Sequence, residues 1–220
     1  MTDTTPPVDE EATEERARAE ERFSQSLEED LSGDTVEQPR ARWEGLFKKR
    51  DPLVLLNTGT GKGKTSAALG VTMRAWGRGW KICWLQFIKS KKSRYGETRA
   101  AEAMGIEMIP LGDGFTWLSK DIEKDIKLAH EAWALAKEKI YSAQYDLVVL
   151  DEVTYPVKYG WLAVEEVIEV LRDRPANVHI IMTGRYADPK LIEFADLVTE
   201  MMEIKHPYKS GIKAQPGIDF

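Results

Sequence analysis

The sequence contains one cysteine, Cys83, and no long apolar run. A single cysteine excludes an intramolecular disulfide and a four-cysteine zinc site, and it favours a reducing compartment. No stretch approaches the roughly 18 apolar residues that a membrane-spanning helix needs. The N-terminus begins with polar and acidic residues, unlike a secretory signal peptide. These absences predict a cytoplasmic protein with no membrane segment.

Patterns of covalent catalysis and of metal binding by histidine are also missing. The three histidines are not spaced as metal ligands. The sequence has no nucleophile elbow and no Cys/His pair, so covalent catalysis by the protein has no support. Concentrated basic charge is limited to one run, which a solvated loop explains as readily as nucleic-acid contact: Lys89, Lys91, Lys92 and Arg94.

Charge divides the 220 residues into an acidic N-terminal segment and a slightly basic remainder. Residues 1–40 hold thirteen Asp or Glu against four Arg, which leaves 24 acidic and 27 basic residues after them. With few apolar residues, the first segment cannot bury enough surface to offset its ordering entropy. We predict a solvated tail over residues 1–40, or a conditional helix over residues 10–31 that docks elsewhere. Residues 41–220 are expected to form one domain.

From residue 53 onwards, short apolar runs alternate with longer helical stretches. Residues 53–57 are typical of a buried strand, residues 66–76 of a helix and residues 81–87 of a second strand, which together make a βαβ unit. Four more strands are expected, over residues 106–111, 147–150, 178–182 and 197–204.

Two helices can be placed between these strands. Apolar residues recur at spacings of three and four from Ile122 to Ile140, which predicts one long amphipathic helix. Asp188 before Pro189 predicts a helix N-terminus with a side-chain cap. Strands that alternate with helices predict an α/β fold, a mostly parallel sheet of about six strands with helices on both faces. Ligands of such sheets bind at the carboxyl ends of the strands.

A phosphate-binding loop is indicated by Gly59-Thr60-Gly61-Lys62-Gly63-Lys64-Thr65, between the first strand and the helix that begins near Ser66. Glycines let successive backbone N–H groups point inward, Lys64 can reach the β- and γ-phosphates, and Thr65 can bind Mg²⁺. Residues 59–66 are therefore expected to bind the triphosphate of ATP. The first glycine of the usual P-loop pattern would fall at Thr58, so the entry to this loop differs from that of ordinary ATPases. The fold expected is P-loop NTPase-like (RecA-like).

Charged residues are expected beside this loop. Asp151 and Glu152 follow the apolar run 147–150, and one of them is predicted to bind magnesium or orient water. The sequence does not distinguish which of these two carboxylates binds the metal. Arg185 ends the strand after it and could contact the triphosphate or another anion, although a surface arginine is the alternative.

Two large aromatics, Phe115 and Trp117, follow Gly114 in a loop after a strand. A flat ligand could stack against them. Aromatics in loops are also common packing anchors, so composition leaves both roles open.

The sequence resembles the corrinoid adenosyltransferases of the P-loop type, also called cob(I)yrinic acid a,c-diamide adenosyltransferases, over most of residues 53–220. The one departure within the phosphate loop is Thr60, where the family often has asparagine. The resemblance rests on seven ordered blocks: Thr58 to Thr65, Gln86 to Lys89, Gly114 to Trp117, Leu150 to Glu152, Thr183 to Arg185, Ala195 to Met201, and Lys205-His206-Pro207-Tyr208 with Gly211-Ile212-Lys213-Ala214-Gln215.

This resemblance implies a reaction in cobalamin biosynthesis or salvage. The 5′-deoxyadenosyl group of MgATP passes to the Co(I) centre of a reduced corrinoid, cobalamin or a precursor, and triphosphate leaves. Co(I) is the nucleophile, so the protein needs no general base. Lys62, Lys64 and Thr65 would act on the triphosphate with Mg²⁺, and Glu152 would act at the metal or the ribose.

The resemblance also implies roles for the aromatic pair and for partners. Phe115 and Trp117 would lie at the lower face of the corrin ring, where excluding the lower axial ligand makes Co(II) easier to reduce. The implied partners are a reducing flavoprotein or another electron donor and a second copy in a homodimer.

Two other functions share the same phosphate loop. A P-loop ATPase or small-molecule kinase would yield ADP, and an ATP-dependent nucleic-acid-binding module would need a coherent basic surface. The later sequence blocks favour the adenosyltransferase, so we expect no nucleic-acid partner.

Overall fold

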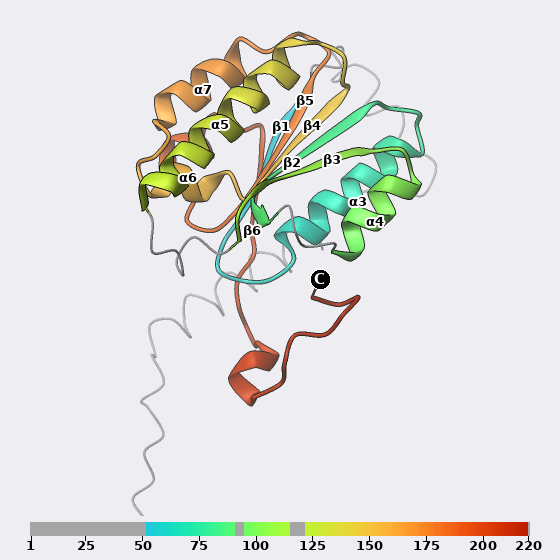
Figure 1. Cartoon of the computed structure of the whole chain (residues 1–220), viewed down its shortest axis with the longest axis vertical. Coiled ribbons are helices and arrows are strands. Elements are labelled where there is room, and N and C mark those ends of the chain that lie inside the picture. The colour runs from blue at the N-terminus through green and yellow to red at the C-terminus, as the bar shows by residue number, and fades with distance from the viewer. Residues whose placement is uncertain (1–51, 91–94, 115–121, 220) are drawn as a thin grey trace, which may run out of the picture. The chain divides into compact units, whose positions relative to one another are not determined.

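The computed structural model describes residues 52–90, 95–114 and 122–219, and within them six strands form one sheet in the order β3-β2-β4-β5-β1-β6 (Figure 1). Every pairing in this sheet is parallel. The prediction of an α/β fold with a mostly parallel sheet of about six strands is confirmed. The strands are β1 (Val54–Thr58), β2 (Ile82–Ser90), β3 (Glu107–Gly112), β4 (Leu147–Asp151), β5 (His179–Thr183) and β6 (Leu197–Glu200).

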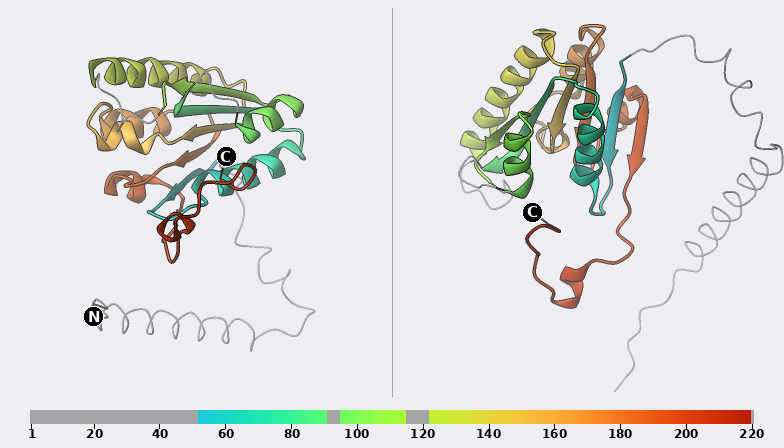
Figure 2. Two further views of the ribbon diagram at one scale, coloured as in Figure 1. Left: turned by 60° about the horizontal axis from the view of Figure 1, so that its bottom comes forward. Right: turned by 90° about the vertical axis from the view of Figure 1, so that its right-hand side faces the viewer.

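Helices cover both faces of the sheet (Figures 1 and 2). On one face lie α3 (Lys64–Trp76) and α4 (Gly96–Ala103), which bury small residues such as Ala68 and Ala101 against it. A short 3₁₀ helix, η2 (Pro207–Ser210), belongs to the C-terminal segment. The helices of the other face are α5 (Ile122–Tyr141), α6 (Thr154–Lys158), α7 (Val164–Arg172) and α8 (Pro189–Phe194).

The core consists of two apolar layers, one on each side of the sheet. Strand side chains alternate between faces, so Trp84 and Val149 join the α3 layer while Leu85 and Leu150 join the α5 layer. Every residue of β4 is buried, as expected for a central parallel strand covered on both faces. The α5 layer also holds Trp133, which is 2% exposed.

Some boundaries differ from the sequence-based expectation. The last strand, β6, ends at Glu200, so the prediction of a strand over residues 197–204 is wrong for residues 201–204. There the Met201 N–H donates to the Thr58 carbonyl at 2.9 Å, and the Met201 carbonyl accepts from the Gly61 N–H at 2.6 Å. The chain therefore leaves the sheet and runs along the loop between β1 and α3. The expected cap at Asp188 is confirmed, since its side chain accepts from the Lys190 N–H at 2.8 Å.

Because β1, β4 and β5 are parallel neighbours, their carboxyl ends lie together at one edge of the sheet, the edge formed by the strand ends. The loop after β1 and the C-terminal segment after β6 lie at the same end of the sheet in Figure 1. None of the described helices is long and apolar enough to cross a membrane.

Candidate functional site

The loop between β1 and α3 needs glycine at defined positions. Gly59 and Gly63 have φ values of 96° and 113°, in the left-handed region that favours glycine. A Cβ on Gly59 would lie 2.4 Å from the Met201 carbonyl oxygen, and one on Gly61 would lie 2.6 Å from that of Met202. The segment that follows β6 is thus packed directly against the loop, and it fixes the loop's shape.

Lys64 points back into this loop. Its ammonium is buried and donates to the carbonyl oxygens of Gly59, at 2.9 Å, and Gly61, at 2.6 Å. Burial lowers the pKa of Lys64, while the Glu152 carboxylate opposes that shift. The loop thus holds a positive charge at the N-terminus of α3, where the helix dipole also favours an anion.

Asp151 ends β4 and is fully buried. Its Oδ1 accepts from the Thr65 hydroxyl at 3.0 Å and from the Thr183 hydroxyl at 2.7 Å. Its Oδ2 has no hydrogen-bond partner within the described residues. Burial raises the pKa of Asp151, and the nearby Lys89 ammonium and the two hydroxyls oppose that rise. The carboxylate therefore links the N-terminus of α3 to β5, and its Oδ2 remains available as an acceptor.

Glu152 follows in a left-handed backbone conformation, with φ of 64°, which is uncommon for a residue other than glycine. Its N–H donates to the Thr183 hydroxyl at 2.9 Å, and its Oε2 is buried without a partner in the described part of the chain. Burial, followed by the charge of Asp151, raises the pKa of Glu152 to about 7. Such strain and such a shift are typical of functional sites.

These oxygen atoms suit a divalent cation. Mg²⁺ prefers oxygen ligands and is usually held by one or two carboxylates together with phosphates and water. Thr65, Asp151 and Glu152 offer a hydroxyl and two carboxylates, and each carboxylate has one unpartnered buried oxygen. Among the residues described, no group of three or more His, Cys, Asp or Glu could hold a metal ion by itself. The residues therefore fit a magnesium ion that arrives with a nucleotide.

The remaining predicted site residues differ in their surroundings. Thr60, Lys62 and Ser66 are exposed, and the Lys62 ammonium forms an ion pair with Asp219 of the C-terminal segment. Arg185 is half-buried after β5, where its charge acts on Lys64 and on Glu152. The predicted corrinoid-binding residues, Phe115 and Trp117, lie outside the described residues.

A polar row along the sheet edge was not predicted as part of the site. Gln86 is in register with Asp151 on the neighbouring strand, and Asn57 is in register with Thr183. Asn57 donates from Nδ2 to the Lys64 carbonyl at 3.3 Å. Polar residues within otherwise apolar strands were the available signal, although strand partners cannot be read from one sequence.

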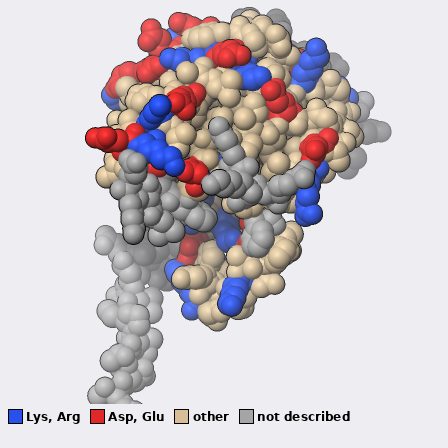
Figure 3. Space-filling view, in the orientation of Figure 1, with Lys and Arg blue, Asp and Glu red and all other residues tan. Residues whose placement is uncertain are grey.

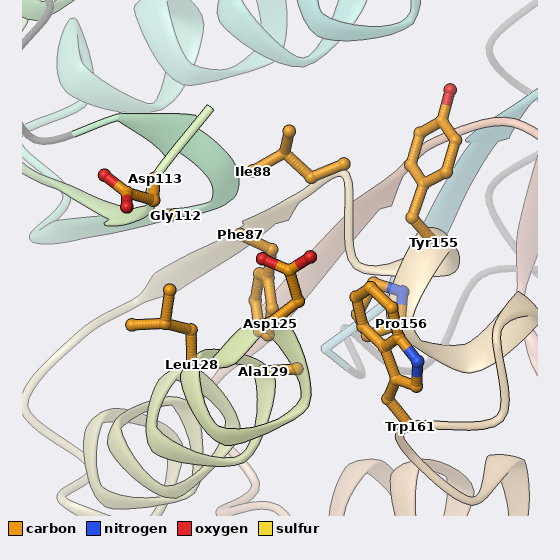
Figure 4. A pocket seen from close by; sticks show the side chains of 10 residues that line it. All are labelled: Phe87, Ile88, Gly112, Asp113, Asp125, Leu128, Ala129, Tyr155, Pro156 and Trp161. Carbon is orange, nitrogen blue, oxygen red and sulfur yellow. The ribbon is translucent and has the colours of Figure 1, made fainter. Parts of the chain in front are cut away.

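A small cavity lies where β3 leads into residues 115–121 (Figure 4). Phe87, Asp125 and Trp161 converge on it from β2, from α5 and from the turn after α6. Its volume of about 20 Å³ has room for roughly one water molecule. The cavity lined by these described residues cannot hold a corrin ring by itself.

Charges of both signs intermix on the face shown in Figure 3. Independently of that view, ion pairs join charged residues of different helices, such as Lys190 with Glu165 and Lys137 with Glu166. Among the described residues visible on that face, the Lys and Arg side chains do not form a continuous stripe.

The family model and the curated relatives agree with each other. Residues 50–220 match the model of the family described as ATP:corrinoid adenosyltransferase BtuR/CobO/CobP. The chain is 42% identical over 182 residues to a corrinoid adenosyltransferase of Pseudomonas aeruginosa, covering 80% of this chain and 89% of the relative. It is 40% identical over 168 residues to a corrinoid adenosyltransferase of Escherichia coli K12, covering 76% and 85%. A match to a solved structure of a DNA replication initiation factor covers 77% of this chain and 47% of that one, at 15% identity and a TM-score of 0.33. This likeness is too low to indicate a shared function.

Proposed function

The chain belongs to the ATP:corrinoid adenosyltransferase family BtuR/CobO/CobP and is a corrinoid adenosyltransferase, and we propose that residues 59–66 hold the triphosphate of ATP while Co(I) of a reduced corrinoid attacks C5′. The bond between cobalt and C5′ forms as the bond between C5′ and the triphosphate oxygen breaks. Triphosphate leaves with that electron pair. The protein then has to align C5′ with the cobalt and stabilise the charge of the leaving group.

The position of Lys64 carries this proposal. Its buried ammonium faces the carbonyls of Gly59 and Gly61 at the N-terminus of α3, with no fixed carboxylate bonded to it among the described residues. A phosphate oxygen entering the loop would replace those neutral acceptors with a charged one, which is a stronger hydrogen bond. Arg185 adds positive charge near the same loop, and Lys62 would act on the triphosphate by exchanging its partner Asp219 for a phosphate oxygen.

Magnesium is proposed at the acidic side of the loop. Thr65 and the carboxylates of Asp151 and Glu152 would hold it, and it would neutralise charge on the triphosphate when bound. The unpartnered oxygens of both carboxylates support this assignment and leave the choice between them to experiment.

The absence of a protein nucleophile agrees with the substrate's chemistry, because reduced cobalt supplies the electron pair. Phe115 and Trp117 are proposed at the lower corrin face on the resemblance alone. There they would exclude a lower ligand from Co(II) and so ease its reduction. An electron donor such as a reduced flavoprotein and a homodimer are further proposals supported by the resemblance. A cytoplasmic location is proposed because a single cysteine, the buried thiol Cys83, favours a reducing compartment.

An anaerobic assay with ATP, Mg²⁺ and chemically reduced cobalamin tests the proposed function. We expect adenosylcobalamin and inorganic triphosphate in equal amounts, measured by absorbance and by ³¹P NMR. ADP or orthophosphate as the first product, without adenosylcobalamin, would instead support the ATPase or kinase alternative.

A further inference from the structure

Gln86 is a buried polar residue that the proposed chemistry does not use. It lies in β2, is 1% exposed, and neither its Nε2 nor its Oε1 has a hydrogen-bond partner within the described residues. A glutamine amide can donate two hydrogen bonds and accept two. Buried amide groups almost always have hydrogen-bond partners in native proteins, so a buried amide without a partner requires an explanation.

The neighbours of Gln86 show on which side its partner must lie. Gln86 is in register with Pro110 of β3 on one side and with Asp151 of β4 on the other. Proline has no N–H and no polar side chain, so it offers the amide nothing. Residues in register on parallel strands point to the same face, and Asp151 carries an equally unpartnered Oδ2.

The other two side chains of this polar row, Thr183 and Asn57, each have a hydrogen-bond partner. The Thr183 hydroxyl donates to Asp151 Oδ1 at 2.7 Å, and Asn57 donates to the Lys64 carbonyl at 3.3 Å. The unmet groups of the row are therefore the Gln86 amide and Asp151 Oδ2, side by side at the edge where the phosphate loop begins. Two adjacent unmet groups of complementary chemistry indicate a shared small polar ligand.

We propose that Gln86 is a positioning residue of the nucleotide site, which together with Asp151 Oδ2 holds a water molecule bound to the metal ion or the triphosphate of MgATP. The inference rests on the proposed function, because it assumes that MgATP occupies the loop. Outer-shell groups of this kind orient the ligands of a metal and change its affinity when removed. Gln86 would thus act through Asp151 and the water.

The test compares Gln86→Met with Thr72→Val. Methionine keeps the length of the side chain and removes its polar atoms. Thr72 is the matched control, since it is 2% exposed and its buried hydroxyl also lacks a described partner, but it lies further along α3 from the loop. Calorimetry measures ATP affinity of the whole chain with Mg²⁺ and with EDTA, and thermal unfolding measures stability without nucleotide.

We expect Gln86→Met to weaken MgATP binding about tenfold or more while metal-free ATP binding changes less than about twofold. Its apo melting temperature should be unchanged or higher, because unmet polar atoms have been removed from the interior. Thr72→Val should leave both affinities unchanged. If Gln86→Met does not fold, Gln86→Asn serves instead, since it withdraws the amide by one methylene and should give the same split.

Two results would overturn the inference. Wild-type MgATP affinity in the Gln86 variant would mean that the amide holds only an internal water. Equal losses with Mg²⁺ and with EDTA, accompanied by a lower melting temperature, would mean a structural role. Failure of the proposed function is recognised separately, because the wild-type chain would then give no adenosylcobalamin or no MgATP binding.

Discussion

Replacing Glu152 with glutamine should make the apo protein more stable than the wild type at pH 8, with an advantage that shrinks as the pH falls to 4.5. Burial, followed by the Asp151 carboxylate, raises the pKa of Glu152 from 4.5 to about 7. Between these values the folded state binds more protons than the unfolded state, so wild-type stability falls as the pH rises. The rise of about 2.5 corresponds to a ceiling of about 3 kcal/mol, at about 1.36 kcal/mol per pKa unit. Residual solvent contact lowers the expected difference to about 1–2 kcal/mol.

Denaturant unfolding of both proteins, without nucleotide or divalent cations, measures this difference at intervals from pH 4.5 to 8. Glutamine has the length of glutamate and would carry the same φ of 64°, so backbone strain cancels in the comparison. Glu193→Gln, at an exposed position, serves as the control for replacing a carboxylate by an amide at the surface. A constant difference for Glu152→Gln across this range, or a variant less stable than wild type at pH 8, would refute the reasoning.

Three further predictions concern the loop and the aromatic pair. Lys64→Ala and Thr65→Ala should each lower kcat by a factor of about 10²–10³, as loss of a preorganised charge contact does. The control Lys190→Ala, at an exposed position, should keep the wild-type rate. Near-normal rates in both loop variants would contradict the site assignment. Gly61→Ala places a Cβ 2.6 Å from the Met202 carbonyl oxygen and should lower the free energy of unfolding by about 1–3 kcal/mol, measured by denaturant unfolding. The control Gly70→Ala, in α3 with no atom within 4 Å of the new Cβ, should raise it by about 0.5–1 kcal/mol. Equal effects would mean that the C-terminal segment does not pack tightly against the loop. Phe115→Ala or Trp117→Ala should impair turnover that starts from Co(II) cobalamin with a mild reductant, and preformed Co(I) should restore most of it; equal losses in both assays would assign these residues to packing or ring binding.

The glycine-rich loop between β1 and α3 could be predicted because its sequence pattern is local. Glycines, Lys64 and Thr65 lie within seven consecutive residues, and the apolar run before them and the helical pattern after them set their backbone context. The same holds for the α/β fold, since short apolar runs indicate buried strands and a 3.6-residue apolar period indicates helices without knowledge of contacts. The end of β6 was missed because it depends on hydrogen bonds to Thr58 and Gly61, far away in the sequence.

By itself, the sequence determined the order of the strands, the glycine-rich loop between β1 and α3, and the acidic pair at the end of β4. The binding of phosphate by that loop stays a prediction. Only the tertiary structure decided which oxygens of that pair are already bonded, because Thr65 and Thr183 reach Asp151 from α3 and β5. It also decided that Gln86 lies beside Asp151, since strand register joins residues that are 65 positions apart in the chain. Desolvation at that edge, which raises the pKa of Glu152, depends on the packed layers around it. Periodicity along a chain reports how each segment folds, whereas burial, charge proximity and unmet hydrogen bonds arise only when the segments pack together.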